Sequence, residues 1–268
     1  MQYMNPVAAE YATGQYYDQQ GAEYYLSASK LESDYSPVRF EREIRLFRKY
    51  CQAGDVLDVG CGSGAFLNQL GKQFAGSYKI LGTDVSGGPL DYAESRGVPV
   101  ARGNFLSLSF VGRKFDAVTM WAVAEHLLEP QKFLERIDAI LQPAGVCFVL
   151  TPNMKSLAVH LLGAKYRYIY PQHLNYFTAR TLARLADPWF ETVETRYTHF
   201  NPLVIWQDWR GQGKDVSNAE RGELLKRTTS YKQKSGKGPL KLAYKSVELM
   251  LAALGLADNI ALVLKRRN

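Results

Sequence analysis

Apolar and polar positions change their period along the chain, and these changes predict the order of its elements. Short apolar runs typical of buried strands lie at 55–60, 79–84, 98–103, 115–121 and 146–152. Between them, apolar residues recur at helical spacing, in the segments 65–74, 89–96 and 130–142. Strands that alternate with helices predict a parallel sheet with helices on both faces, so we expect an α/β fold.

The flanking segments predict further elements. Ser36 and Pro37 are the residue types of a helix N-cap and first position, and Ile44 and Phe47 then follow at helical spacing up to Tyr50. Residues 143–145, Pro-Ala-Gly, should separate the helix before them from the next strand. Downstream we expect an aromatic loop at 164–178, a helix at 178–187 capped by Thr178, a strand at 190–200 and a closing strand at 259–267.

The region before the closing strand is less regular. Residues 210–239 are polar, basic and interrupted by glycine, which predicts an irregular excursion. In 240–256 the apolar residues follow an amphipathic helical pattern: Leu240, Tyr244, Val247, Leu251 and Leu254. Residues 1–30 are rich in tyrosine, which predicts a cover packed on the fold and not a strand of its core.

The positive charge is confined to the C-terminal part of the chain. The 268 residues carry a net charge of +7, but residues 210–268 hold 13 Lys+Arg and 5 Asp+Glu, so this part has +8 and the rest −1. A basic appendage is therefore expected, and a nucleic-acid-binding surface is not. Three scattered cysteines exclude a disulfide scaffold and a cysteine-based zinc site. With no secretory pattern and no apolar run of membrane-spanning length, we expect a cytoplasmic protein.

We expect a single domain over 1–268. Its predicted parts are an N-terminal helical cover at 1–50, a ligand-binding core at 51–202, a basic and amphipathic insert at 203–257 and a last strand at 259–267. The insert has three alternative roles: a lid on the active site, a peripheral contact with an anionic membrane through 240–256, or a homodimer contact.

A glycine-rich loop is the strongest chemical signal. Asp58 precedes Gly60, Gly62 and Gly64 where a strand is followed by a helix, and Asp84 ends the next strand. Glycines let the backbone approach a ligand, and an acid in the position of Asp84 can accept hydrogen bonds from ribose hydroxyls. The same spacing also satisfies the dinucleotide pattern, so a nicotinamide-dependent reductase stays an alternative. However, Asp58 would repel a pyrophosphate, whereas it could hold the ammonium of an amino acid.

The segment VLDVGCGSG resembles motif I of class I S-adenosylmethionine-dependent methyltransferases. The segments GTDVS, FDAVTMWAVAEHLLEP and LQPAGVCFVLTPN resemble later motifs of that class, and further segments between 36 and 203 resemble the ubiquinone-biosynthesis O-methyltransferase branch. This resemblance implies a Rossmann-like, doubly wound, seven-stranded and mostly parallel sheet with a final antiparallel strand. It also implies S-adenosyl-L-methionine as the cofactor.

The resemblance assigns cofactor-binding roles to residues of this chain. Asp58 would contact the methionine amino group, Arg39 the methionine carboxylate, and Asp84 the ribose. Val85, Asn104 and Phe105 would surround the adenine, and Trp121 would line the methyl-transfer centre. Gly60, Gly62 and Gly64 would let the loop pass the cofactor, and Cys61 would be a small packing residue in that loop.

Two histidines are candidates for contact with the methyl acceptor. His126 follows the fourth strand of the pattern, and His173 lies in the aromatic loop that should cover the site. We interpret His160 and His199 as structural. Some relatives carry an acid where this chain has Ala122, so we predict no metal.

The function predicted is transfer of a methyl group to a hydroxyl of a small or lipid-linked metabolite. The sequence leaves open carbon or nitrogen methylation of a sugar or secondary-metabolite intermediate. A binding protein that has kept the fold but lost transfer activity is a further alternative.

Overall fold

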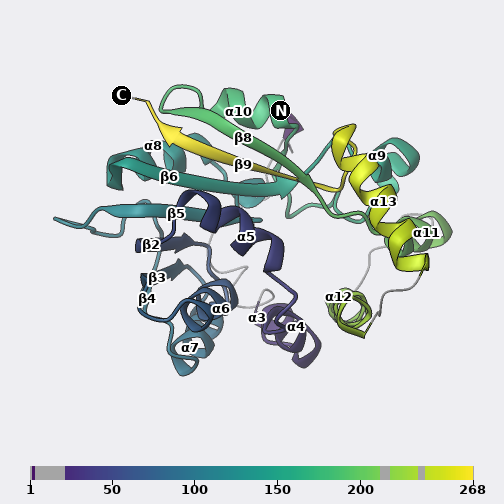
Figure 1. Ribbon diagram of the computed structural model, residues 1–268, viewed down its shortest axis with the longest axis horizontal. Coiled ribbons are helices and arrows are strands. Elements are labelled where there is room, and N and C mark those ends of the chain that lie inside the picture. Colours follow the sequence, from purple (N-terminus) through teal and green to yellow (C-terminus); the bar gives the residue numbers. More distant parts are fainter. Residues whose placement is uncertain (1, 4–21, 212–217, 235–238, 268) are drawn as a thin grey trace.

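The computed structural model describes residues 2–3, 22–211, 218–234 and 239–267 (Figure 1). Much of the tyrosine-rich segment predicted as a cover, including Tyr11, Tyr16 and Tyr17, lies outside these residues. None of the described helices combines the length and the apolar character that crossing a bilayer requires.

Seven strands form the central sheet, in the order β4-β3-β2-β5-β6-β9-β8. Strand β9 runs antiparallel to both of its neighbours, while the pairs from β4 to β6 are parallel, as the resemblance implied. The strands are β2 (Gly54–Val59), β3 (Tyr78–Asp84), β4 (Val100–Arg102), β5 (Phe115–Trp121), β6 (Leu141–Pro152), β8 (Phe190–Thr198) and β9 (Asn259–Arg266). A separate small ladder pairs β1 (Gln2–Tyr3) with β7 (Asn175–Tyr176).

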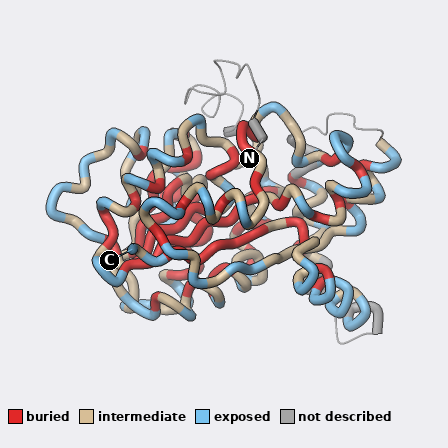
Figure 2. The backbone as a smooth tube through the Cα atoms, turned by 90° about the horizontal axis from the view of Figure 1, so that it is seen from above, coloured by how far each residue is buried: buried red, intermediate tan, exposed pale blue. Residues whose placement is uncertain are grey.

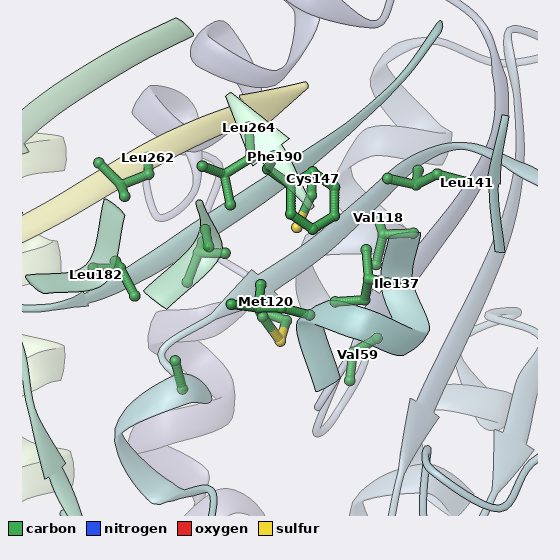
Figure 3. Close-up of a cluster of buried hydrophobic side chains, with 14 of the residues drawn as sticks. Val59, Val118, Met120, Ile137, Leu141, Cys147, Leu182, Phe190, Leu262 and Leu264 are labelled. Atoms are coloured by element: carbon green, nitrogen blue, oxygen red, sulfur yellow. The ribbon is translucent and has the colours of Figure 1, made fainter. Parts of the chain in front are cut away.

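Helices cover both faces of the sheet because the strands point alternate apolar side chains to opposite sides. On one face, α5 (Glu41–Tyr50), α6 (Ala65–Gln73) and α7 (Gly87–Ser95) enclose a core that includes Val56 and Phe148. On the other face, α8 (Pro130–Ile140) and α10 (Ala179–Ala186) cover the core that includes Leu57 and Cys147, part of which is drawn in Figure 3. The central strands β2, β5, β6 and β9 are mostly buried, whereas the edge strands β4 and β8 are largely not (Figure 2).

The predicted start of the first long helix is wrong. Helix α5 begins at Glu41, after a turn in which the Arg39 amide donates to the Ser36 carbonyl over 3.0 Å. The side-chain amide of Gln69 on α6 donates to the same carbonyl over 3.0 Å. This contact between distant segments holds Ser36 in the turn, so the preference of serine for the N-cap position does not start a helix here.

The break at 143–145 is a bulge within a strand, whereas the sequence predicted a separator before one. Leu141 lies opposite Phe115, and Val146 lies opposite Ala117, so four residues of β6 oppose one of β5. The predicted cap at Thr178 is confirmed: its hydroxyl accepts from the Thr181 amide over 3.2 Å in a capping box.

The insert contains helices throughout its described part. They are α11 (Pro202–Gly211), α12 (Asn218–Lys234) and α13 (Pro239–Ala253). The prediction of an irregular 210–239 is therefore wrong for 218–234. This polar helix packs on α4 (Ala28–Asp34), where the hydroxyls of Ser33 and Thr229 lie 2.7 Å apart. Leu224 of the same helix packs on the apolar cluster that includes Leu162 and Val204, so polar and apolar tertiary contacts together position a helix that periodicity does not report.

The predicted amphipathic stripe of α13 is only partly correct. Leu251 is buried, but Leu254 is 63% exposed and Val247 is 38% exposed. The buried side of the helix instead includes Glu248, whose carboxylate binds Arg42 of α5 through two hydrogen bonds of 2.5 and 2.6 Å. An ion pair with another helix therefore sets the rotation of α13.

The aromatic core under α5 gives a prediction about stability. Phe47 is fully buried, and its ring packs on those of Phe66, Tyr78 and Phe148. Phe47→Ala should lower the free energy of unfolding by about 3–5 kcal/mol, because it removes buried area and leaves a cavity. Urea denaturation would measure this against Val111→Ala, a site that is 94% exposed. A loss as small as that of the control would contradict the assignment of this core.

Candidate active site

One cavity of about 400 Å³ extends along the carboxyl edge of the parallel strands. Because β9 is antiparallel, it adds its first residue, Asn259, to the same edge. Helices α3 (Ala22–Tyr25), α4, α5 and α12 and the aromatic loop add residues around the opening. The predicted site residues that line it are Arg39, Asp58, Gly60, Cys61, Gly62, Asp84, Val85, Asn104, Phe105, Trp121, His126 and His173.

The glycines of the loop have different physical roles. Gly62 has a φ of +52°, and a Cβ there would meet no atom within 4 Å, so its backbone borders open space. Gly60 has a φ of +73°, and a Cβ would lie 2.5 Å from Val123 Cγ2. Gly64 does not line the cavity; a Cβ there would lie 2.8 Å from the Ala93 Cβ of α7. Gly64 therefore permits close packing of the start of α6 on α7, and its role in letting the loop pass the cofactor stays a prediction.

Asp84 connects the end of β3 to the glycine loop. Its Oδ2 accepts from the Gly62 amide over 2.8 Å, and its Oδ1 accepts from the Ser86 amide over 3.0 Å. A carboxylate has about four acceptor positions. These bonds fix the orientation of a carboxylate that lines the cavity.

Asp58 is buried at the end of β2. The Thr119 hydroxyl donates to its Oδ1 over 2.6 Å. Burial, together with the negative charge of Asp84, raises the pKa of the Asp58 carboxyl to about 7, although the Thr119 bond opposes this. A cation beside Asp58 would therefore favour its ionised form.

The part of the cavity beside the glycine loop and Asp84, where the resemblance places the cofactor, is called the cofactor end. The segments after β3 and β4 form its sides. Val85 is 41% exposed, so it presents an apolar surface there. The Asn104 side-chain oxygen accepts from the Leu106 amide over 2.9 Å. Phe105 is almost fully buried and packs on Phe133, so most of its ring belongs to the core. Burial raises the pKa of the Cys61 thiol well above its usual value, which agrees with a packing role.

Arg39 and Trp121 also line the cavity. Arg39 pairs with Asp34 over 3.4 Å. Trp121 packs between Phe66 and Phe148, and its indole nitrogen is buried without a hydrogen-bond partner among the described residues. A buried donor of this kind on a cavity wall is suited to a ligand acceptor.

Glu125, His126 and His173 form a compact cluster after β5. Each offers an atom within 4.8 Å of the others, and the two imidazole rings are 4.7 Å apart. The Nδ1 of His126 lies 2.9 Å from the Gln172 carbonyl, and that of His173 lies 2.9 Å from the Tyr168 carbonyl. Burial lowers the pKa of His126 to about 4 and raises that of Glu125 to about 7. Near pH 7 His126 is therefore neutral, whereas Glu125 is divided between its neutral and ionised forms.

A second pair of titratable residues in the cavity was not predicted from the sequence. Glu43 of α5 and His199, just after β8, both line it, and His199 Nε2 lies 3.4 Å from Glu43 Oε1. His199 had been interpreted as structural, and Glu43 had not been singled out. The two are 156 positions apart, so no local motif joins them.

We expect the Glu125–His126–His173 cluster to hold no metal, although its donor atoms could ligate one. The raised pKa of Glu125 leaves it a weak anionic ligand near neutral pH, and residue 122 is an alanine. Elemental analysis of protein purified without chelator should find substoichiometric metal. The thermal midpoint should not change after dialysis against EDTA. Stoichiometric metal that disappears in Glu125→Gln would contradict this expectation.

Comparison with known proteins places this site in a family. A methyltransferase-domain family matches residues 35–187, more than half of the chain. The ubiquinone biosynthesis O-methyltransferase of Dinoroseobacter shibae is 28% identical over 176 residues, covering 60% of this chain and 69% of that protein.

Solved structures share the fold. An S-adenosylmethionine-dependent methyltransferase of Thermotoga maritima, described as a possible histamine N-methyltransferase, has a TM-score of 0.58 at 15% identity, covering 92% of this chain and 99% of its own. The N-methyltransferase NodS of Bradyrhizobium japonicum, solved with S-adenosylhomocysteine, has a TM-score of 0.54 at 14% identity, covering 93% and 98%.

The family match spans the glycine loop and Asp84 of the cofactor end, and it also spans the cluster after β5. The alternative of a nicotinamide-dependent reductase is therefore set aside. The chain belongs to the methyltransferase-domain family and is a class I methyltransferase that depends on S-adenosylmethionine.

Proposed function

We propose that the protein transfers a methyl group from S-adenosylmethionine to a hydroxyl oxygen of a small or lipid-linked metabolite. One observation carries the proposal. One cavity is lined both by the glycine loop and by histidines, of which His199 contacts the carboxylate of Glu43. A hydroxyl must lose its proton as it becomes a nucleophile, and histidine is the side chain best suited to accept it near neutral pH.

The residues of the cofactor end fit the chemical groups of S-adenosylmethionine. Asp84 lines the cavity and would accept from the ribose hydroxyls, and the open backbone of Gly62 leaves room for a ligand beside it. Val85 offers an apolar surface for the adenine, and Asn104 borders the same space. Asp58 would hold the methionine ammonium, and Arg39 the carboxylate. When bound, the cofactor supplies an electrophilic methyl group on a sulfonium.

The protein's contribution to transfer is alignment and exclusion of water. The Trp121 ring is wedged between two phenylalanines, so it can limit the approach of an acceptor to one side. Leu225 of α12 lines the cavity, which supports the role of the insert as a cover. The relative from Dinoroseobacter shibae is named an O-methyltransferase, which favours oxygen over carbon or nitrogen as the acceptor atom.

A lipid-linked acceptor is supported by the outer surface of the insert. Several large apolar residues of α11 and α13 are exposed: Leu203, Trp206, Trp209, Leu242, Leu249, Met250 and Leu254. The insert also holds more Lys and Arg than Asp and Glu, and this combination is the composition of a peripheral membrane contact. That contact and a homodimer remain predictions.

Cofactor binding should depend on pH through Asp58. Its pKa of about 7 means that an ammonium ligand must displace a proton at lower pH. The affinity for S-adenosylmethionine should therefore fall as the pH decreases from about 7.5 to 5.5, approaching tenfold per unit. Calorimetric titration across this range would measure it. The slope should vanish in Asp58→Asn but persist in Asp91→Asn, at an exposed acid of α7. A slope unchanged in Asp58→Asn would overturn the assignment.

The acceptor atom can be tested with a matched panel. Catechol, aniline and thiophenol offer oxygen, nitrogen and sulfur nucleophiles on similar rings. We expect labelled methyl to pass to catechol, and the product to be a methyl ether by mass spectrometry. Methylation of nitrogen, sulfur or ring carbon in preference to oxygen would refute the proposal.

Cofactor affinity should depend on Asp84. Asp84→Asn should weaken cofactor affinity about tenfold to a hundredfold, because hydrogen bonds to a charged group are lost. Asp91→Asn is the control.

A further inference from the structure

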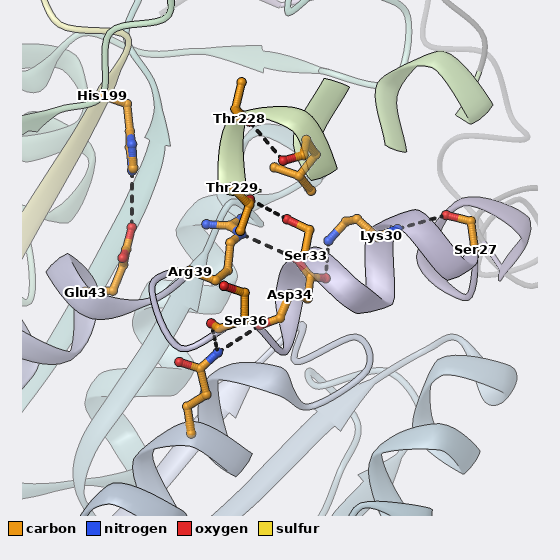
Figure 4. Close-up of polar contacts among 12 residues, drawn as sticks. Ser27, Lys30, Ser33, Asp34, Ser36, Arg39, Glu43, His199, Thr228 and Thr229 are labelled. Carbon is orange, nitrogen blue, oxygen red and sulfur yellow. Dashed lines mark hydrogen bonds and ion pairs between the residues drawn. The ribbon is translucent and has the colours of Figure 1, made fainter. Parts of the chain in front are cut away.

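We infer that His199 is the general base of the methyl transfer, and that Glu43 is the positioning residue that holds it. The inference rests on the proposed function, since it names the group that takes the proton from the acceptor hydroxyl. Figure 4 shows the pair: the Glu43 side chain of α5 and the His199 side chain point toward one another. Both residues line the cavity.

The backbone at His199 is held in an unusual conformation. Among the described residues, only Ala122 and His199 combine a positive φ with a side chain beyond glycine, and both line the cavity. The φ of His199 is +67°, a region that residues with a Cβ rarely adopt. The Asp258 amide donates to the His199 carbonyl over 2.9 Å, and Asp258 Oδ2 accepts from the Asn201 amide over 3.0 Å. Strain maintained by surrounding contacts is typical of functional positions.

Glu43 is a buried anion whose charge is directed at His199. Burial alone would raise the pKa of Glu43, but the hydrogen bond and charge of His199, together with Arg39, lower it to about 2. Its Oε2 is buried without a hydrogen-bond partner among the described residues. Glu43 therefore stays ionised at neutral pH and cannot itself accept the proton. Its charge instead stabilises a protonated His199.

The tautomer follows from the contact. A neutral His199 donates its Nε2 hydrogen to Glu43 Oε1, which leaves the lone pair on Nδ1. The acceptor oxygen forms a bond to the methyl carbon as the carbon–sulfur bond of the cofactor breaks, and that electron pair stays on sulfur. The hydroxyl proton passes to His199 Nδ1 and later to water. His126 is less suited, because its lowered pKa makes it a weak base.

The location in the sheet agrees with this role. The glycine loop and Asp84 follow β2 and β3, whereas His199 follows β8 at the opposite end of the strand order. The glycine loop and His199 therefore reach the cavity from different strand ends, and Arg39 lies near enough to Glu43 to lower its pKa. The charged and titratable groups that share this part of the cavity are Tyr24 of α3, Lys30 and Asp34 of α4, Arg39, and Tyr168 and His173 of the aromatic loop. Asp258 lies next to the pair in the chain before β9.

The test uses the full chain, S-adenosylmethionine and catechol, with the pH profile of kcat as the readout. His199→Gln should lower kcat at neutral pH by about 10²–10⁴-fold and remove the acidic limb of the profile. His199→Asn is the second variant, because asparagine tolerates a positive φ well. Glu43→Gln should shift the limb to lower pH, because the imidazolium loses its anion. His160→Gln, at an exposed histidine outside the cavity, is the control and should match the wild type.

A second acceptor separates a base from a binding residue. 4-Nitrocatechol ionises more readily than catechol, so its transfer needs less help from a base. The loss caused by His199→Gln should therefore be much smaller with 4-nitrocatechol. An increase in KM alone, with kcat and its pH profile unchanged, would overturn the inference.

The proposed function and this inference fail differently. If the wild type methylates no hydroxyl, the proposed function fails. The pair is then judged by NMR titration of labelled histidine in the complex with S-adenosylhomocysteine. His199 should titrate above the ordinary histidine value of about 6.5, and Glu43→Gln should lower its pKa. A His199 pKa that does not respond to Glu43→Gln would overturn the inference independently of activity.

Discussion

The parallel pairing of β2 with β3 and β5 is the constraint on which the rest of the site depends. It brings the ends of three strands to one edge, so Asp58, Asp84 and Trp121 meet although the sequence separates them. The 2.8 Å bond from the Gly62 amide to Asp84 then joins the glycine loop to the neighbouring strand. If this register shifted, the cofactor end would lose its acid and its open backbone together.

Buried carboxyl groups give the cavity its chemical character. Asp58, Glu125 and Glu43 are all nearly inaccessible to solvent, yet their pKa values differ: about 7, about 7 and about 2. The difference follows from their partners. Asp58 has a hydroxyl donor and another carboxylate nearby, whereas Glu43 has His199 and Arg39. One cavity is therefore lined by acids that titrate near neutral pH and by one that stays ionised, which suits a site for a cationic cofactor.

The two ends of the chain cover this edge together. Helix α12 of the insert packs on α4, with Lys226 bound to Glu32 over 2.8 Å, and Leu225 faces the cavity. Helix α13 is joined to α5 through Arg42 and Glu248. The Lys226–Glu32 pair is exposed and adds little to stability, whereas Glu248 is buried in its pair with Arg42. A cover of this kind suits a site that must open for acceptor and product.

The sequence by itself determined the sheet, the glycine loop and the acid after β3, because each is a local pattern. Strand and helix periods are read over a few residues, and Asp58, Gly62 and Asp84 lie within a single βαβ unit. The tertiary structure decided what depends on distant contacts. Gly64 belongs to the same local glycine pattern, but the close neighbour that favours a glycine there, Ala93, lies on another helix. The polar helix α12 packs on α4, where the hydroxyls of Thr229 and Ser33 are hydrogen-bonded. Glu43 and His199 met only because α5 crosses the sheet near the end of β8. A motif records spacing along the chain, whereas a pair brought together by folding leaves no such spacing to read.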